Sequence, residues 1–430
     1  MRSRRRCPSH SPILFALLLT TGAAGAAMAG ELGFNPMGDG SASSNGDFQH
    51  DLSTGCASCS APPPEWGAPP ADLDWSLSLR GAITNDDDGT RYELIAVPEA
   101  RLVHQTLRGG YELGMSAELG YAPETGSARI GGLTLDARAE HRFDAVTSSE
   151  VTARLSLSQD DPSSGDFADS VEAAPLVIEG VVEGAVRRDF GPFDAEGRWN
   201  LGRKLNGDTL YADGSSIDNT HDDVSVGGLG GRVGVRLGPM VRAFVDGSVE
   251  RELYDAASPN VGVRLDNYTY ALRGGFEARL GPLVEAEASI GYGYRDFEVA
   301  GLGDFGQMLF DGRITVRPAE TLALGAELTT SFDGPGSMAG ARARVTHRLA
   351  GTAAYEVNPW LTLRGSAGWS EALSVGTGTA EVEWTVGAGA DYQLNQNMQA
   401  SADYQFSRTQ TMPAPQEDAH RLTLGLTLDR

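Results

Sequence analysis

Cys56 and Cys59 have the C-x-x-C spacing that proteins use for disulfides, redox centres, haem attachment and zinc sites. Haem attachment needs a His after the second Cys, where this chain has Ser60. A zinc site needs two more ligands, and the remaining cysteine is the distant Cys7. The surrounding Ser, Gly and Pro lack the strand and helix of a redox fold. We therefore expect a short disulfide loop between Cys56 and Cys59 in an oxidising compartment.

His221, Asp222 and Asp223 form a cluster of acidic and imidazole side chains that could serve a hydrolase. A solvated acidic loop has the same composition, and we favour that interpretation. The signature motifs of serine hydrolases, P-loop proteins, zinc proteases and EF-hands do not occur in the sequence, and Lys204 is the single lysine. The sequence therefore predicts no enzyme, no catalytic residue, no cofactor and no metal site.

Charged side chains at every second position are stronger candidates, because alternation places them on one face of a strand. Arg342 and Arg344 stand among the apolar residues Ala341, Ala343 and Val345. We expect both arginines to point into a polar lumen, on a basic wall that faces an acidic wall, since rings of charge let pores select ions. The predicted pore-lining residues are Arg342, Arg344, Arg364, Glu277, Glu285 and Glu287. Ion pairs that only brace a plugged barrel are the alternative.

The first 29 residues have the layout of a secretory signal peptide. Arginines near the N-terminus precede an apolar run from Ile13 to Leu19, and small residues lead to an expected cleavage site after Ala29. Residues 30–74 are rich in Gly, Ser, Pro and Asn and have no periodicity. We expect this segment to be a disordered periplasmic lead that contains the C-x-x-C pair.

The composition argues against a single large soluble core. Of 430 residues, only 40% are hydrophobic and 55 are glycine. A net charge of −24 has the wrong sign for holding phosphates, so we expect no nucleic-acid partner. Beyond the signal region no apolar run reaches the roughly 18 residues of a membrane-spanning helix.

From Trp75 to the end, apolar and polar residues alternate with period two in nearly every segment. In residues 284–294 the apolar positions are Val, Ala, Ala, Ile, Tyr and Tyr, and in 422–428 they are four leucines. Strands with one apolar and one polar face are expected from this pattern.

The connections between these strands alternate in length. Tight turns such as Gly281-Pro282 alternate with longer polar loops such as 205–223, and aromatic residues gather at both strand ends, for example Tyr292 and Tyr392. A soluble sandwich or propeller does not predict either feature. The predicted fold class is all-β: a transmembrane antiparallel up-and-down β-barrel of 16–18 strands over residues 75–430. We expect it in the outer membrane of a Gram-negative bacterium, with both termini periplasmic.

Three stretches carry a resemblance to a known family. They are Gly-Tyr-Gly-Tyr-Arg-Asp-Phe at 291–297, Ala-Tyr-Glu-Val-Asn-Pro-Trp-Leu-Thr-Leu at 354–363, and Asp-Tyr-Gln-Leu at 391–394 followed by Ala-Asp-Tyr-Gln-Phe at 402–406. In these, the chain from about residue 75 resembles the putative β-barrel porin-2 family of outer-membrane proteins. The resemblance implies the barrel fold, and some members accompany exopolysaccharide synthesis and export. Such barrels are inserted by the barrel-assembly machinery and usually end in an aromatic residue, whereas this chain ends in Arg430.

The predicted function is a porin-like passive channel or an export conduit, for small polar solutes or polysaccharide. A non-conducting structural or adhesive surface barrel is the alternative, and an outer-membrane hydrolase is the least favoured. Segments 85–90, 159–173 and 205–223 contain three, five and five acidic residues and no Lys or Arg. We expect these segments outside the cell, associated through divalent cations with anionic lipopolysaccharide as well as outer-membrane lipid. The pattern indicates no oligomeric state.

Overall fold

The computed structural model describes residues 71–86, 89–124, 126–159, 171–259, 261–335, 340–411 and 416–430. The predicted signal peptide, the Cys56–Cys59 pair and almost all of the predicted lead lie outside these ranges. The described residues are mostly strand, with one short 3-10 helix, η1 (Thr220–Asp222). No helix among them is long and apolar enough to cross a bilayer.

Eighteen strands form the main sheet. In chain order they are β1 (Asp72–Asp86), β2 (Gly89–Thr106), β3 (Gly109–Ala122), β4 (Ser127–Arg142), β5 (Thr147–Gln159), β7 (Leu176–Phe190), β8 (Phe193–Asn206), β11 (Val224–Arg236), β12 (Val241–Tyr254), β13 (Asn267–Leu280), β14 (Val284–Phe297), β15 (Phe305–Ala319), β16 (Leu322–Asp333), β17 (Ala343–Asn358), β18 (Leu361–Val375), β19 (Ala380–Asn395), β20 (Met398–Thr411) and β21 (Gln416–Asp429). A small separate sheet contains β6 (Val171–Ala173), β9 (Thr209–Tyr211) and β10 (Ser216–Ile217).

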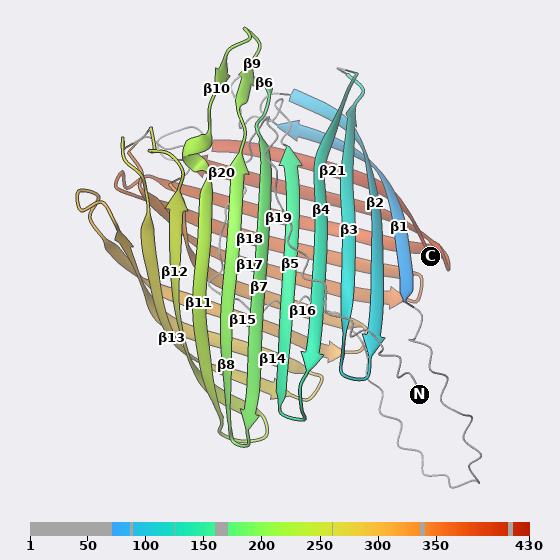
Figure 1. The fold of residues 1–430 in the computed structure, drawn as a ribbon. Coiled ribbons are helices and arrows are strands. Elements are labelled where there is room, and N and C mark those ends of the chain that lie inside the picture. The colour runs from blue at the N-terminus through green and yellow to red at the C-terminus, as the bar shows by residue number, and fades with distance from the viewer. Residues whose placement is uncertain are drawn as a thin grey trace, which may run out of the picture.

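The main sheet closes on itself. Each of its strands pairs antiparallel with the next one along the chain, and β1 also pairs with the last strand, β21, where Leu79 lies opposite Leu426. The result is a barrel, whose front wall in Figure 1 runs from β1 to β12. The predicted fold class is confirmed, and the strand number is 18, the upper end of the predicted range.

The outer surface of the barrel is apolar because every second residue of a strand points outward. In β14, Ile290 and Tyr292 are 53% and 52% exposed, whereas Arg295 on the opposite face is 1% exposed. In β21 the exposed residues Leu422 and Leu424 repeat the pattern. A lipid-facing barrel requires this arrangement, since hydrocarbon covers the outside and polar groups gather within.

The two rims of the barrel differ. At the turn rim the connections are tight, and Gly191 and Gly281 adopt the left-handed φ values of 80° and 60° that such turns require. At the loop rim most connections are longer, and β9 and β10 stand above it (Figure 1). The described chain starts and ends at the turn rim, because Asp72 lies opposite Val103 near the β2–β3 turn.

The sequence predicts an acidic loop at segment 85–90, but its residues 85, 86, 89 and 90 belong to strands β1 and β2. Asn85 pairs with Thr90 and Asp86 with Gly89 as the last rungs of the β1–β2 hairpin. The Asn85 amide donates to Thr90 Oγ1 at 2.7 Å, and the next residue, Arg91, forms an ion pair with Asp86. Polar side chains therefore pair across the strands here and extend the ladder.

The loop half of the lumen contains an apolar core. Val224 of β11 and Tyr254 of β12 pack there with Leu265 from the β12–β13 loop, Leu302 from the β14–β15 loop, and Ala343 at the start of β17. All five are buried. These loops therefore fold inward against the β11–β14 wall and narrow this end of the barrel.

Candidate functional site

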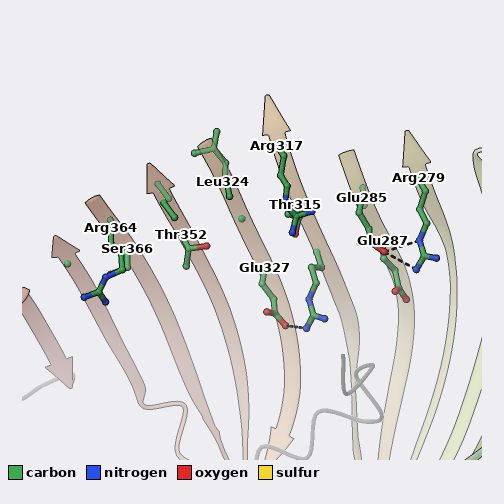
Figure 2. Close-up of a pocket in the computed structure, with 18 of the residues that line it drawn as sticks. Arg279, Glu285, Glu287, Thr315, Arg317, Leu324, Glu327, Thr352, Arg364 and Ser366 are labelled. Atoms are coloured by element: carbon green, nitrogen blue, oxygen red, sulfur yellow. Dashed lines mark hydrogen bonds and ion pairs between the residues drawn. The ribbon is translucent and has the colours of Figure 1, made fainter. Parts of the chain in front are cut away.

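The turn half of the lumen holds a cavity of about 1040 Å³. Its arginines are Arg187, Arg232, Arg242, Arg279, Arg313, Arg317 and Arg364. Its acidic residues are Glu196, Glu277, Glu285, Glu287, Glu327 and Asp403. Figure 2 shows several of them on neighbouring strands of one wall. The lining has one more basic than acidic residue, although the whole chain carries −24.

The most deeply buried ion pair that a lining residue forms joins Arg242 of β12 to Asp194 of β8, which lies outside the lining. Arg242 Nε donates to Asp194 Oδ1 at 2.8 Å, a second guanidinium nitrogen contacts the other carboxylate oxygen, and a third contacts Glu277 of β13. Arg242 is 9% exposed and Asp194 is 1% exposed. Buried charges of this kind are tolerated only when paired, so these residues fix the wall.

Arg232 of β11 extends the network toward the cavity. Its guanidinium donates to Glu287 Oε1 at 3.0 Å and to Asp246 Oδ2 at 3.2 Å. The same group lies 4.2 Å from the ring centre of Phe244, within cation–π range. Arg232 therefore links three strands and holds Glu287 at the edge of the cavity.

The remaining pairs are more exposed to the cavity. Arg279 pairs with Glu285 across β13 and β14 at 2.8 Å, and Arg313 pairs with Glu327 across β15 and β16 at 2.9 Å (Figure 2). These four side chains are 41–74% exposed. Exposed pairs are weak and exchange partners easily, so a charged or polar solute can compete for them.

At the other end of the wall shown in Figure 2, Arg364 of β18 contacts two carboxylates. Its Nε lies 2.6 Å from Asp391 Oδ2, and its Nη2 lies 2.9 Å from Asp403 Oδ1. Arg317 also lines the cavity, near the end of β15 (Figure 2). Charges of both signs therefore occur along the cavity wall.

The structure divides the six predicted pore-lining residues between two places. The four that line the cavity are Arg364, Glu277, Glu285 and Glu287. Arg342 and Arg344 lie near the loop rim, outside the cavity lining. Arg364 of β18 lies opposite Ala354 of β17, and Ala354 is ten residues from Arg344 along that strand. Arg344 and Arg364 are therefore far apart along the length of the barrel.

Local contacts explain the position of the two loop-rim arginines. Arg342 precedes β17 and donates to the carbonyl oxygen of Leu302 in the β14–β15 loop. Arg344 has its Nη1 3.8 Å from Glu381 Oε2 on β19. Ala343 between them is buried in the apolar core of the lumen, although the sequence pattern placed it on the face away from the lumen.

Asp194 and Asp246 are structurally prominent residues that the sequence pattern did not single out. Both occupy polar positions of alternating strands, which is a signal that could have included them. Their arginine partners are 48 and 14 residues away in the chain, as Arg242 and Arg232. Only the strand register brings such distant residues together.

The His221 cluster has a structural explanation. His221 Nε2 lies 3.6 Å from Asp222 Oδ2 within η1, and Asp223 Oδ1 accepts a hydrogen bond from the Asn206 backbone N–H at 2.6 Å. Burial raises the pKa of both Asp222 and Asp223. Asp223 thus ties the β8–β11 loop to the end of β8. Among the described residues, no group of three His, Cys, Asp or Glu could hold a metal ion.

A family model matches residues 105–430, from the end of β2 to the last residue of the chain. The chain belongs to the family described as putative beta-barrel porin 2. This confirms the resemblance found in the sequence. Membership of a porin family, together with the closed 18-stranded barrel, indicates an outer-membrane protein of Gram-negative bacteria.

Solved structures of similar fold come from Pseudomonas aeruginosa. OccK3 (OpdO) is 14% identical, with a TM-score of 0.44, and the match covers 83% of this chain and 96% of that one. OpdK, whose crystal structure was determined with vanillate, is 14% identical, with a TM-score of 0.43 and coverage of 84% and 99%. These likenesses concern the fold alone. No curated protein matches the chain.

Proposed function

We propose that this protein is a passive channel that lets small polar solutes cross the outer membrane through its lumen. The observation that carries the proposal is the cavity of about 1040 Å³, lined by seven arginines and six carboxylates. Charged side chains are inexpensive beside water and costly in a dry interior. A hydrated lumen with mixed charges favours polar solutes and rejects apolar ones.

The orientation of the barrel is part of this proposal. The turn rim faces the periplasm, where both termini lie, and the loop rim faces outside. The acidic β5–β7 and β8–β11 loops then meet anionic lipopolysaccharide and associate with it through divalent cations. Insertion by the barrel-assembly machinery accompanies this topology.

Conductance of the purified, refolded full chain tests the function. In planar bilayers we expect discrete conductance steps, and in proteoliposomes we expect faster uptake of a monosaccharide and an amino acid than of a tetrasaccharide. Liposomes without protein and protein unfolded by boiling are the controls. A folded barrel that yields neither steps nor uptake would contradict the proposal.

A non-conducting structural barrel is the second candidate, and the apolar core in the loop half favours it. Its expected result is a heat-stable barrel without conductance. Export of polysaccharide is a finer version of the channel and follows from the family resemblance. Faster efflux of a long anionic oligosaccharide than of a monosaccharide would support it. We also propose that the chain lacks enzymatic activity, and His221→Ala should therefore change no hydrolytic rate.

A further inference from the structure

The barrel wall has an unusual seam between β15 and β16. The ladder joining these strands runs from Gly312 opposite Leu328 to Ala319 opposite Leu322. Toward the loop rim, residues 305–311 of β15 and 329–333 of β16, all of them described, have no rung between them. Thr330 Oγ1 bridges the gap instead, 3.3 Å from the backbone nitrogen and 3.2 Å from the backbone oxygen of Phe310.

At this seam the loop-rim end of the β16–β17 hairpin lies on the lumen side of strands β14 and β15. Phe332 and Val345 are opposite each other and continue the alternation of Leu328 and Leu349, which face outward and are exposed. Phe332 and Val345 are nevertheless buried, because they pack on Leu309 from the inner face of β15. The outward-facing side of the β16–β17 hairpin end thus covers the inward-facing side of β15.

Small residues make this overlap possible. Gly293 of β14 lies beneath the Phe332 ring, and a Cβ added there would collide with that ring. Ala271 of β13 belongs to the same buried cluster. Further along, Ala343 enters the apolar core formed with Val224. The hairpin end is therefore packed on a surface shaped to receive it.

Arg295 of β14 holds the hairpin end in place. Its guanidinium donates to the carbonyl oxygens of Asp333 at 3.2 Å and Phe332 at 3.3 Å, and to Glu252 Oε1 at 2.9 Å. Arg295 thus supplies donors to two carbonyl groups at the loop-rim end of β16. Backbone groups left without partners inside a barrel wall are costly, so this latch stabilises the overlapped state.

We propose that the hairpin end, residues 329–333 and 342–345, is the gate of the channel. In the structure it lies folded into the loop half of the lumen, latched by Arg295 and by the contact of Arg342 with Leu302. To open, it swings outward and extends the β15–β16 ladder along residues 305–311. In the closed state Thr330 hydrogen-bonds to the Phe310 backbone and Arg295 to the Phe332 and Asp333 carbonyls. In the open state ladder rungs replace these contacts, which gives the two alternative packings that a switch requires. This inference rests on the proposed channel function.

Single-channel recording of the full chain tests the gate with two loosening variants. Arg295→Met removes the guanidinium and keeps an apolar side chain, and Gly293→Ala places a Cβ where the Phe332 ring packs. Arg295→Met should raise the open probability about tenfold, because the hydrogen bonds from Arg295 to the Phe332 and Asp333 carbonyls exist only in the closed state. Gly293→Ala should raise it as well. The matched control is Arg154→Met on β5, away from the seam, where Arg154 pairs with Asp136 at 2.7 Å.

A covalent lock tests the same motion from the closed side. Leu309→Cys is combined with Phe332→Cys, in a background where Cys56 and Cys59 are replaced by Ser. The oxidised protein should stay in the low-conductance state, and conductance should rise when a reductant opens the bond. Equal conductance before and after reduction, with the disulfide verified by mass spectrometry, would overturn the gate.

Amide hydrogen exchange separates the gate from the channel function. In Arg295→Met and Gly293→Ala, amides of residues 305–311 should exchange more slowly than in the wild type, because new rungs protect them. Slower exchange without conductance in any variant supports the motion and contradicts the channel. Unchanged exchange, or a wild type that conducts as both variants do, overturns the gate and leaves the channel standing.

Discussion

Arg242 on β12 reaches Asp194 on β8 across the full width of β11, with Nε 2.8 Å from Oδ1. Gly234 is the β11 residue between them, opposite Phe244 on one side and Asp194 on the other. A Cβ at Gly234 would collide with the guanidinium of Arg242. Because Gly234 has no side chain, the Arg242 guanidinium can lie across β11 and pair with Asp194. The ion pair therefore spans three strands, β8, β11 and β12.

Gly234→Ala should destabilise the barrel by displacing Arg242. Overpacking of this kind costs about 1–3 kcal/mol. The temperature at which the protein loses its folded mobility on SDS gels should fall. Gly231→Ala on the same strand is the control, because a Cβ there meets its nearest atom, the Glu196 carbonyl oxygen, at an ordinary 3.6 Å. Equal transition temperatures for both variants would contradict this account of Gly234.

Arg242→Ala should have a larger effect, about 3–5 kcal/mol, because it leaves the buried Asp194 carboxylate without its main partner. Asp194→Asn added to Arg242→Ala should recover part of the loss by removing the buried charge. Arg154→Ala breaks an exposed pair, with side chains 66% and 45% exposed, and should cost less than about 1 kcal/mol. Urea unfolding in detergent measures all three, and similar losses for Arg242→Ala and Arg154→Ala would argue against the buried pair.

Ion selectivity should depend on the arginines of the cavity. Replacing Arg317 and Arg364 together by Ala removes two positive charges from the lining, so the reversal potential in a salt gradient should shift toward cation selectivity. Replacing Arg342 and Arg344 should shift it less, because both lie outside the cavity lining. The reverse order of the two shifts would place the selective region at the loop rim.

The closed barrel should resist SDS until it is boiled. Because β1 pairs with β21, the main sheet of the described residues has no free edge strand whose unpaired backbone groups would let detergent start unfolding. We expect faster gel migration before heating than after, and recovery in the outer-membrane fraction. Identical mobility in both samples, combined with recovery in the soluble periplasm, would rule out a membrane barrel.

A cysteine placed at Ser215, between β9 and β10 at the loop rim, should react with a membrane-impermeant maleimide in intact cells. Ser215 is exposed, so a reagent outside the cell can reach this position. In the wild type the Ser215 hydroxyl donates a hydrogen bond to Asp213, which lowers the pKa of that loop carboxylate and keeps it charged. Divalent cations should therefore raise the retention of the protein on lipopolysaccharide-coated beads, and chelation should release it. Labelling only after permeabilisation would show that the loop rim faces the periplasm.

Alternation along the chain was enough to predict the fold. A residue such as Ile290 or Leu424 lies next to lipid because the side-chain period of a strand is two, and this period can be read without knowledge of any partner strand. Glycine turns such as Gly281 separated the tight rim from the loop rim for the same local reason. The barrel, its approximate strand number and the charged lumen could thus be predicted from sequence.

Tertiary structure decided which charges meet and where the lumen narrows. Asp194 and Arg242 are 48 residues apart, and only the registers of β8, β11 and β12 make them partners. Alternation alone placed Ala343 on the face away from the lumen, yet the hairpin end folds inside the wall and buries it in the lumen. Period two specifies the face of a strand that a side chain occupies. Whether that face meets lipid, water or another strand depends on long-range packing, which no local pattern encodes.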